Sequence, residues 1–90
     1  MLPINPDVTS VQPLPGYRLL LEFSNGERRT FDVTPYHSKG VFIQLRDPAI
    51  FAAVRVAYGS VEWPGEIDLS YDTLYIRGIP VDSLTSRTVA

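Results

Sequence analysis

Two neighbouring segments of the chain alternate apolar and polar residues, and a turn signal separates them. In residues 17–23 every odd position is apolar, and residues 28–33 alternate again toward their end, at Phe31 and Val33. A period of two is typical of strands with one buried face, and the intervening Ser-Asn-Gly is typical of a turn. The sequence therefore predicts a β-hairpin over residues 17–33.

The register of this hairpin follows from its hydrophobic pattern. A two-residue turn would pair Leu19 with Asp32, so that the apolar face of one strand would share a side with the polar face of the other. A three-residue turn, residues 24–26, pairs Leu19 with Phe31 instead. Because a slip of one residue moves every side chain to the opposite face, the pattern selects the longer turn. We therefore predict Gly26 in the left-handed bulge position, where a missing Cβ removes the steric cost.

The segments around the hairpin are short. Residues 8–14 carry β-branched side chains and end among prolines, which favours an edge strand. After the hairpin, Thr34-Pro35 predicts the start of a single helical turn and Gly40 predicts its end. The apolar residues 41–45 fit either a short strand or an extended packing segment, and the sequence leaves these two alternatives open.

The second half of the chain opens with a helix signal. Asp47-Pro48 combines an N-cap residue with proline at the first helical position, which predicts a short helix near residues 48–54. Ser70 is placed to cap a single helical turn over residues 71–74, and Tyr75 and Ile76 are expected to close the core. Short strands are expected at residues 54–58, 61–63 and 67–69.

These elements predict an α+β domain with one mainly antiparallel sheet of about five short strands. One short helix and one or two single helical turns are expected on one face of it. A chain of 90 residues allows one domain, 1–90, with a folded part of about 8–76 and flexible ends at 1–7 and 82–90. Each expected core residue lies on the apolar side of its own segment: Leu19, Leu21, Phe31, Leu45, Phe51 and Trp63.

Composition excludes several classes of protein. The absence of cysteine excludes disulfides and thiolate metal sites, and eight basic against ten acidic residues argue against a dedicated nucleic-acid binder. No apolar run approaches the roughly 18 residues of a transmembrane helix, and the first residues lack the features of a signal peptide. We therefore expect a small soluble intracellular domain without direct nucleic-acid binding.

Blocks of strand and turn residues follow one another in a specific order and spacing. The first are Gly16-Tyr17-Arg18-Leu19, Phe23-Ser24-Asn25-Gly26-Glu27 and Arg29-Thr30-Phe31-Asp32-Val33. The middle group is Gly40, Phe42, Leu45-Arg46-Asp47, Phe51 and Val54. The last are Gly59-Ser60-Val61-Glu62-Trp63-Pro64, Ile67-Asp68-Leu69 and Leu74-Tyr75. With these blocks, over about residues 8 to 76, the chain resembles the bacterial domain-of-unknown-function family numbered 2442.

The resemblance implies a small, cytoplasmic bacterial protein, and it supplies no established activity, catalytic residue or cofactor. Some members of the family are parts of longer chains with an appended helix-turn-helix, and some are encoded beside a second small protein in toxin–antitoxin-like pairs. The leading hypothesis is therefore a non-enzymatic protein-interaction module, such as one member of such a pair. The alternative is an accessory module of DNA-linked regulation that acts through a partner, and an enzyme of unknown class is the third hypothesis.

Few residues are candidates for a catalytic or metal-binding role. His37 is the only histidine in the sequence and lacks a neighbouring nucleophile-elbow pattern, so we expect a loop residue that lies on the surface or caps a turn. The acidic residues between positions 62 and 72 lack a recognised metal-ligand spacing, and turn chemistry explains Asp68 and Asp72. The hairpin residues Arg18, Glu22 and Arg28 are interpreted as a solvated face of mixed charge. We expect no catalytic, metal or cofactor site.

Aromatic residues lie close to the acidic stretch, and tyrosine and tryptophan dominate binding hot spots. Trp63 and Tyr75 are assigned to the core, and the remaining residues define a candidate interaction surface. Its members are Tyr58, Glu62, Glu66, Asp68, Tyr71 and Asp72. The expected partner is another protein or a second copy of the chain, and a dimer through a sheet edge would cover exposed strand groups.

Overall fold

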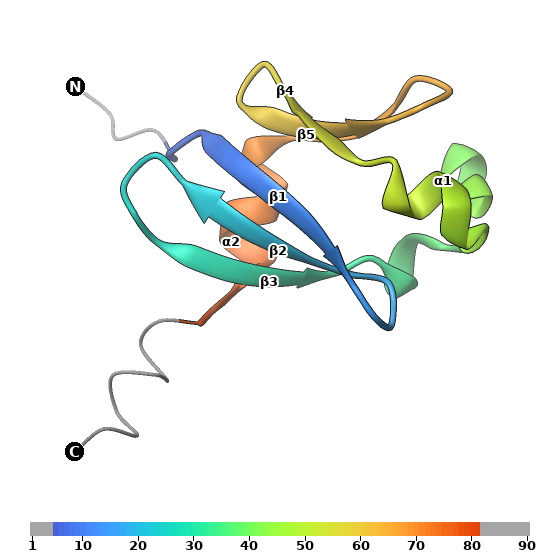
Figure 1. Cartoon of the computed structure of the whole chain (residues 1–90), viewed down its shortest axis with the longest axis horizontal. Coiled ribbons are helices and arrows are strands. Elements are labelled where there is room, and N and C mark those ends of the chain that lie inside the picture. The colour runs from blue at the N-terminus through green and yellow to red at the C-terminus, as the bar shows by residue number, and fades with distance from the viewer. Residues whose placement is uncertain (1–4, 82–90) are drawn as a thin grey trace.

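The computed structural model describes residues 5–81, so the expectations for residues 1–4 and 82–90 lie outside the described residues. Three strands are followed by three short helices, three further strands, one helix and a last strand (Figure 1). The strands are β1 (Val8–Leu14), β2 (Arg18–Phe23), β3 (Arg28–Asp32), β4 (Arg55–Ala57), β5 (Ser60–Trp63), β6 (Ile67–Leu69) and β7 (Ile79–Pro80). The helices are the 3-10 helices η1 (Thr34–Tyr36) and η2 (Gly40–Arg46) and the α-helices α1 (Pro48–Ala52) and α2 (Tyr71–Arg77).

The strands form two antiparallel sheets, which confirms the α+β class but corrects the expectation of one sheet with about five strands. The first sheet has the order β1-β2-β3-β7 and the second has the order β4-β5-β6. The helical segments after β3 carry the chain away from the first sheet, so the next three strands pair only with one another. Where β1 begins, the Val8 amide donates a hydrogen bond of 2.8 Å to the Gly59 carbonyl in the β4–β5 turn.

The β2–β3 hairpin has the predicted register. Leu19 lies opposite Phe31, and Gly26 has φ +88° at the end of a three-residue turn. The Gly26 amide donates to the Phe23 carbonyl at 2.9 Å, and the Phe23 amide donates to the Glu27 carbonyl at 2.9 Å. The pattern of buried side chains therefore determines this turn as the sequence predicts.

The segment before α1 differs from both alternatives that the sequence left open. Residues 40–46 form η2, and Gly40, with φ +51°, begins this helix rather than ending the previous one. A 3-10 helix has about three residues per turn, so Phe42 and Leu45 lie on one face. Leu45 is buried and Phe42 packs against the core, whereas Val41 and Ile43 are half exposed. Phe42 and Leu45 are three residues apart, which is a helical spacing, but the strand-like composition of residues 41–45 did not indicate a helix.

Both α-helices begin at the predicted N-caps. Oδ1 of Asp47 accepts a hydrogen bond of 2.9 Å from the Ala49 amide, and Oγ of Ser70 accepts one of 3.3 Å from the Thr73 amide. However, α2 continues to Arg77 and is longer than the single turn predicted for residues 71–74. Ile76 on this helix is 69% exposed and does not close the core.

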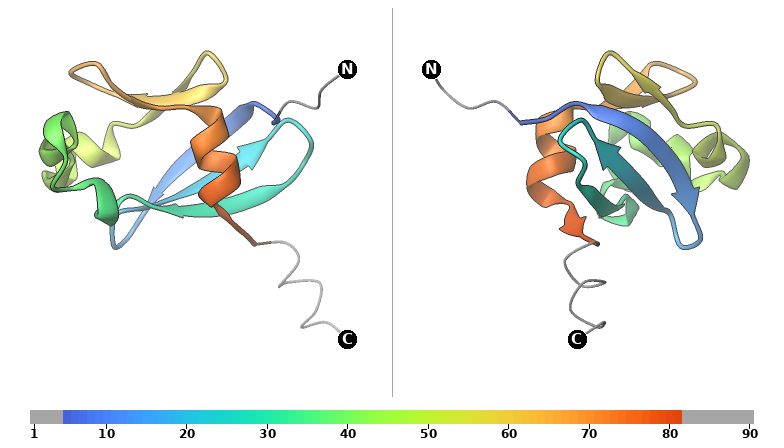
Figure 2. Two further views of the ribbon diagram at one scale, coloured as in Figure 1. Left: turned by 180° about the vertical axis from the view of Figure 1, so that it is seen from behind. Right: turned by 60° about the vertical axis from the view of Figure 1, so that its left-hand side comes forward.

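One hydrophobic core joins the inner faces of both sheets to the helices. All six residues expected in the core are at most 4% exposed: Leu19, Leu21, Phe31, Leu45, Phe51 and Trp63. The Trp63 indole Nε1 donates to the Phe51 carbonyl at 3.0 Å, which satisfies its buried polar atom. Figure 2 shows α2 lying against the β1–β3 sheet, with the short second sheet beyond the N-terminal end of the helix.

Candidate functional site

A groove of about 660 Å³ opens where β3 ends beside α2. This volume is in the range of typical ligand-binding sites. We call it the β3–α2 groove, and its lining comes from both sheets and from the segment after β3. The lining residues are Arg18, Thr30, Phe31, Asp32, Pro35, Tyr36, Lys39, Leu69, Thr73, Arg77 and Ile79.

The edge of β3 is only partly covered at this groove. β7 pairs with β3 at Arg29 and Thr30 and does not extend to Asp32. The Val33 amide donates to the Tyr17 carbonyl at 3.0 Å, so the odd-numbered residues of β3 bond to β2. Because bonding directions alternate along an antiparallel strand, the backbone groups of Asp32 point away from β2. A short stretch of the β3 edge therefore faces outward next to the start of β7.

Three cations line the groove without an acidic partner. The side chains of Arg18 and Arg77 have no hydrogen bond or ion pair within residues 5–81, and the Lys39 ammonium interacts with the ring of Tyr36, with its Nζ at 5.7 Å from the ring centroid. Elsewhere in this part of the chain, Arg29 and Arg55 pair with glutamates, and Nε of Arg46 donates to a carbonyl. The unpaired cations therefore gather at one place.

The single carboxylate in the lining has a structural role. Asp32 lies opposite Arg18 in the β2–β3 register, but its Oδ1 accepts bonds from the Thr34 amide at 3.0 Å and the Thr34 hydroxyl at 2.7 Å. Such a side-chain bond two residues ahead stabilises the turn from strand to helix. Asp32 thus leads the chain into η1, and the groove keeps an excess of positive charge.

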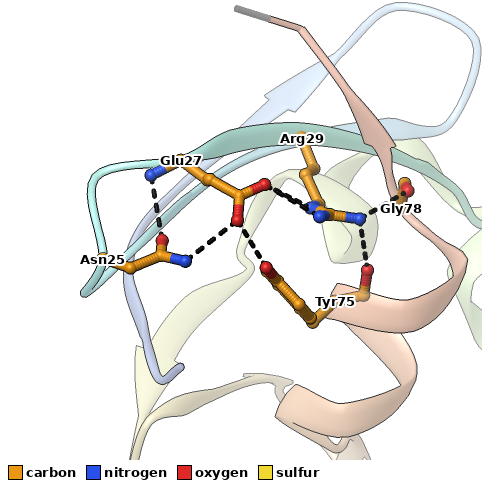
Figure 3. A network of polar contacts seen from close by, with 5 residues as sticks. All are labelled: Asn25, Glu27, Arg29, Tyr75 and Gly78. Carbon is orange, nitrogen blue, oxygen red and sulfur yellow. Dashed lines mark hydrogen bonds and ion pairs between the residues drawn. The ribbon is translucent and has the colours of Figure 1, made fainter. Parts of the chain in front are cut away.

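A network of polar contacts holds α2, one wall of the groove, against the β2–β3 hairpin (Figure 3). Nη1 of Arg29 donates to the carbonyls of Tyr75 at 2.8 Å and Gly78 at 3.3 Å, at the C-terminal end of the helix. The guanidinium also lies 3.9 Å from the centroid of the Tyr75 ring. A cation at this end satisfies orphan carbonyls and the helix dipole. We call the network formed by Asn25, Glu27, Arg29, Tyr75 and Gly78 the Arg29 cluster.

Glu27 connects the cluster to the hairpin turn. Its carboxylate accepts a hydrogen bond from the Tyr75 hydroxyl, one of 2.8 Å from Nη2 of Arg29 and one of 2.9 Å from Nδ2 of Asn25. The bond from Tyr75, followed by that from Arg29, lowers the pKa of Glu27 below its usual 4.5. Because these donors favour the charged form, the cluster is a charge-assisted network at neutral pH.

The candidate surface predicted from the sequence is divided in the structure. Glu62 forms an ion pair with Arg55 and lies opposite Asp68 on β6. Oδ1 of Asp72 accepts a hydrogen bond of 2.9 Å from Nδ2 of the Asn5 side chain, and Tyr71 packs against the core. Glu66 is exposed in the β5–β6 turn with φ +63°. No group of acidic or histidine side chains within residues 5–81 has the arrangement of a metal site.

Tyr58 is the residue of that surface with the most exposed side chain. It is fully exposed, and it lies with Gly59 in a two-residue turn between the paired Ala57 and Ser60. Both turn residues have positive φ, 53° and 76°, as in a type I′ turn. This conformation favours asparagine or glycine at the first position, so a tyrosine there is held at a steric cost.

His37 is partly buried rather than on the surface, and it caps η1, which is the other position expected for it: its amide donates to the Thr34 carbonyl at 3.1 Å. Its ring packs edge-on against Tyr17 with 4.6 Å between centroids, and its Nε2 is buried without a hydrogen-bond partner in the described part of the chain. The Tyr17 hydroxyl donates to the Arg46 carbonyl at 2.6 Å, and its ring contacts Phe51. These contacts give His37 a place in the packing between the hairpin and η2.

The groove was missed because its residues lie far apart in the sequence. Arg18, Lys39 and Arg77 belong to three separate segments with no shared motif, and Arg18 was interpreted as part of a mixed-charge face. Only the predicted pairing of β2 with β3 could place Arg18 near the end of β3. No local signal places α2 beside it.

Comparison with known proteins gives one match. The model of a family described as a protein of unknown function (DUF2442) matches residues 8–80. No curated protein and no solved structure matches the chain. No helix among residues 5–81 is long and apolar enough to cross a membrane. Because the family match spans the hairpin, both sheets and all the helices described above, the chain belongs to the DUF2442 family.

Proposed function

We propose that the chain is a non-enzymatic protein-interaction module of the cytoplasm that binds a partner protein through the β3–α2 groove. The observation that carries this proposal is the convergence of Arg18, Lys39 and Arg77 on one open groove, where none of the three has an acidic partner among residues 5–81. Like charges that gather without compensation repel one another, and a complementary partner removes this repulsion.

The rest of the lining supports binding to a protein. Ile79 provides apolar surface because it is 62% exposed, whereas Leu69 lines the groove as a core residue that is 6% exposed. Tyr36 adds an aromatic ring that is partly buried against the core. Interfaces between proteins combine such apolar and aromatic contacts with a charged rim that directs association.

The lining supports catalysis less well. General acid–base chemistry needs a proton-transfer group aimed at a substrate. The groove has one carboxylate, Asp32, which is engaged by Thr34, and its lining contains no histidine. Binding therefore explains the groove with fewer assumptions than a reaction. A partner encoded beside this chain, as in a toxin–antitoxin-like pair, and a partner that carries a DNA-binding element would both use the groove in the same way.

The proposal is tested by blocking the groove with a bulky side chain. The tagged chain, its Thr73→Trp variant and its Ile76→Trp variant are used to capture proteins from a lysate of the source organism, with quantitative mass spectrometry. Thr73 lines the groove, whereas Ile76 lies on the same helix outside the lining and is exposed. Circular dichroism first establishes that both variants are folded.

We expect one protein to be enriched by the parent chain and by Ile76→Trp and to be lost with Thr73→Trp. Equal recovery by both variants, or no enriched protein with the parent chain, would overturn the proposal. Light scattering of the purified parent and variants distinguishes a second copy of the chain from a different protein as the partner. A second copy predicts a dimer that Thr73→Trp converts to a monomer.

A further inference from the structure

We infer that the occupant of the β3–α2 groove is an acidic segment of the partner that binds in extended conformation. This inference rests on the proposed function and adds the chemistry of the partner to it. It follows from the position of the three cations without an acidic partner in residues 5–81 and from the uncovered edge of β3. The lining also lacks the glycine loops and free aromatic faces that bind phosphates and bases.

The cations are carried by different parts of the groove. Arg18 belongs to β2, Lys39 follows η1, and Arg77 belongs to the last turn of α2. Figure 2 (left) shows α2 and the segment after β3 on the same side of the first sheet. An acidic segment that runs between these two parts meets a cation from each of them. Carboxylates are the protein groups that complement guanidinium and ammonium ions.

The uncovered edge of β3 favours an extended segment. β7 begins its pairing with β3 at Thr30, and the backbone groups of Asp32 face outward before the start of β7. A partner strand that lies against β3 at Asp32 finds hydrogen-bonding groups there, as in the addition of a strand to a sheet edge. Because side chains alternate along a strand, one side of the segment reaches the cations while the other contacts the exposed Ile79.

The lining does not favour a phosphate ligand or a nucleic acid. Phosphate sites commonly use backbone amides of glycine-rich loops, and no glycine lines this groove. Single-stranded nucleic acids need free aromatic faces on which bases stack. The Tyr36 ring is already in contact with Phe31 and Phe42, at 5.8 and 5.6 Å between centroids. A carboxylate-bearing peptide therefore fits the groove better than either of these ligands.

The inference is tested with synthetic peptides and NMR titration of the isotope-labelled chain. The probe is a short peptide that alternates glutamate and valine, and the matched peptide replaces each glutamate by glutamine. Two triple variants remove the same number of positive charges. Arg18→Gln/Lys39→Gln/Arg77→Gln neutralises the groove, and Arg28→Gln/Arg46→Gln/Arg55→Gln neutralises cations outside its lining. Thermal unfolding establishes that both variants are folded.

We expect the glutamate peptide to shift amide resonances of residues 30–32 and 73–79, and the glutamine peptide to bind about tenfold or more weakly. The groove variant should lose about tenfold or more in affinity, and the control variant should lose less than about twofold. Equal weakening in both variants would show attraction to overall charge and would overturn the inference. Shifts elsewhere, or groove shifts produced only by pyrophosphate or a single-stranded oligonucleotide, would overturn it as well.

These outcomes separate the two proposals. If capture of a protein depends on Thr73 but the acidic peptide does not bind the groove, the interaction role stands and the inferred chemistry is wrong. If the peptide binds the groove but no protein is captured through it, the groove recognises acidic peptides and the proposed function is wrong.

Discussion

Within residues 5–81, an arginine–glutamate ion pair lies on each of the two sheets, and these two pairs differ in their surroundings. Arg29 pairs with Glu27 on the β2–β3 hairpin, and its side chain is 15% exposed. Arg55 of β4 pairs with its cross-strand neighbour Glu62 of β5, and its side chain is 74% exposed. The residue types are the same, but only the Arg29–Glu27 pair makes further contacts with a third element of the fold, α2.

The difference lies in the further contacts of each arginine. Arg29 also donates to the carbonyls of Tyr75 and Gly78 and lies over the Tyr75 ring, so it ties α2 to β3 (Figure 3). Arg55 bonds to the Glu62 carboxylate and extends into solvent. An exposed pair contributes little because water screens it and its side chains lose entropy. The contacts around an ion pair, rather than the pair itself, therefore determine its structural role.

The largest effect is expected from removal of the Arg29 guanidinium. Arg29→Met leaves the helix-end carbonyls of α2 without their donor and removes the only cation among the donors to the Glu27 carboxylate within residues 5–81. We therefore expect a loss of about 2–4 kcal/mol in the free energy of unfolding. Arg55→Met removes only an exposed pair and should cost less than about 1 kcal/mol. Urea denaturation followed by circular dichroism measures both variants. Similar losses for the two would show that the comparison between the pairs is wrong.

A methyl group at Gly78 tests how closely β3 and the end of α2 approach. A Cβ there would lie 2.5 Å from the Leu74 carbonyl oxygen and 3.1 Å from Cβ of Arg29. Since the backbone of Gly78 is extended with φ −74°, the cost of Gly78→Ala is steric, and we expect about 1–3 kcal/mol. Thermal unfolding measures it, with the exposed Ile76→Ala on the same helix as control. An unchanged melting temperature in Gly78→Ala would show that the helix end can move away from Arg29 freely.

The sequence predicted those parts of the fold that local rules determine. The alternation around Leu19 and Phe31 fixed the hairpin register, and Asp47 and Ser70 marked both α-helix starts. The last strand, Ile79–Pro80, is too short for any periodicity, and its pairing with β3 depends on α2 bringing the chain back. The extension of α2 to Arg77 is stabilised by Arg29, which lies far away in the sequence.

The candidate site was harder to predict because charge pairing is a property of the folded chain. The acidic stretch contains no base, but β4 brings Arg55 to Glu62 and the N-terminal segment brings Asn5 to Asp72. In contrast, Arg18 was expected within a mixed-charge face, and the structure leaves it without an acidic partner at the groove. The sequence shows how many charges a segment carries but not which of them are compensated.

Substitutions in a turn of each sheet are expected to change the stability by a smaller amount. Gly26, in the turn that carries Asn25 of the Arg29 cluster, has φ +88°, so Gly26→Ala should cost about 1 kcal/mol. In the β4–β5 turn of the other sheet, Tyr58 already occupies such a conformation. Tyr58→Asn should therefore stabilise the protein by about 0.5–1 kcal/mol, because asparagine favours this position of a type I′ turn.

Thermal unfolding of Gly26→Ala and Tyr58→Asn checks the direction of both effects. The two substitutions should move the melting temperature in opposite directions. A loss of stability in Tyr58→Asn would mean that the exposed tyrosine ring contributes to folding. A gain of stability would show that folding does not require the Tyr58 side chain. This turn belongs to the same sheet as the exposed Arg55–Glu62 pair.

The smallest effect is expected from pH, because the Glu27 side chain is 36% exposed and water screens its interactions. The pKa of Glu27 is lowered in the folded protein, so its contribution to stability is fully present above the usual value of 4.5 and is lost as pH falls through the lowered pKa. Below pH 4.5 the unfolded chain binds this proton more readily than the folded chain, which favours unfolding. Urea denaturation at a series of pH values should show a steeper acid loss for the parent than for Glu27→Gln. Parallel pH profiles for the two would show that the Arg29 cluster holds α2 through its helix-end bonds alone, without help from the Glu27 charge.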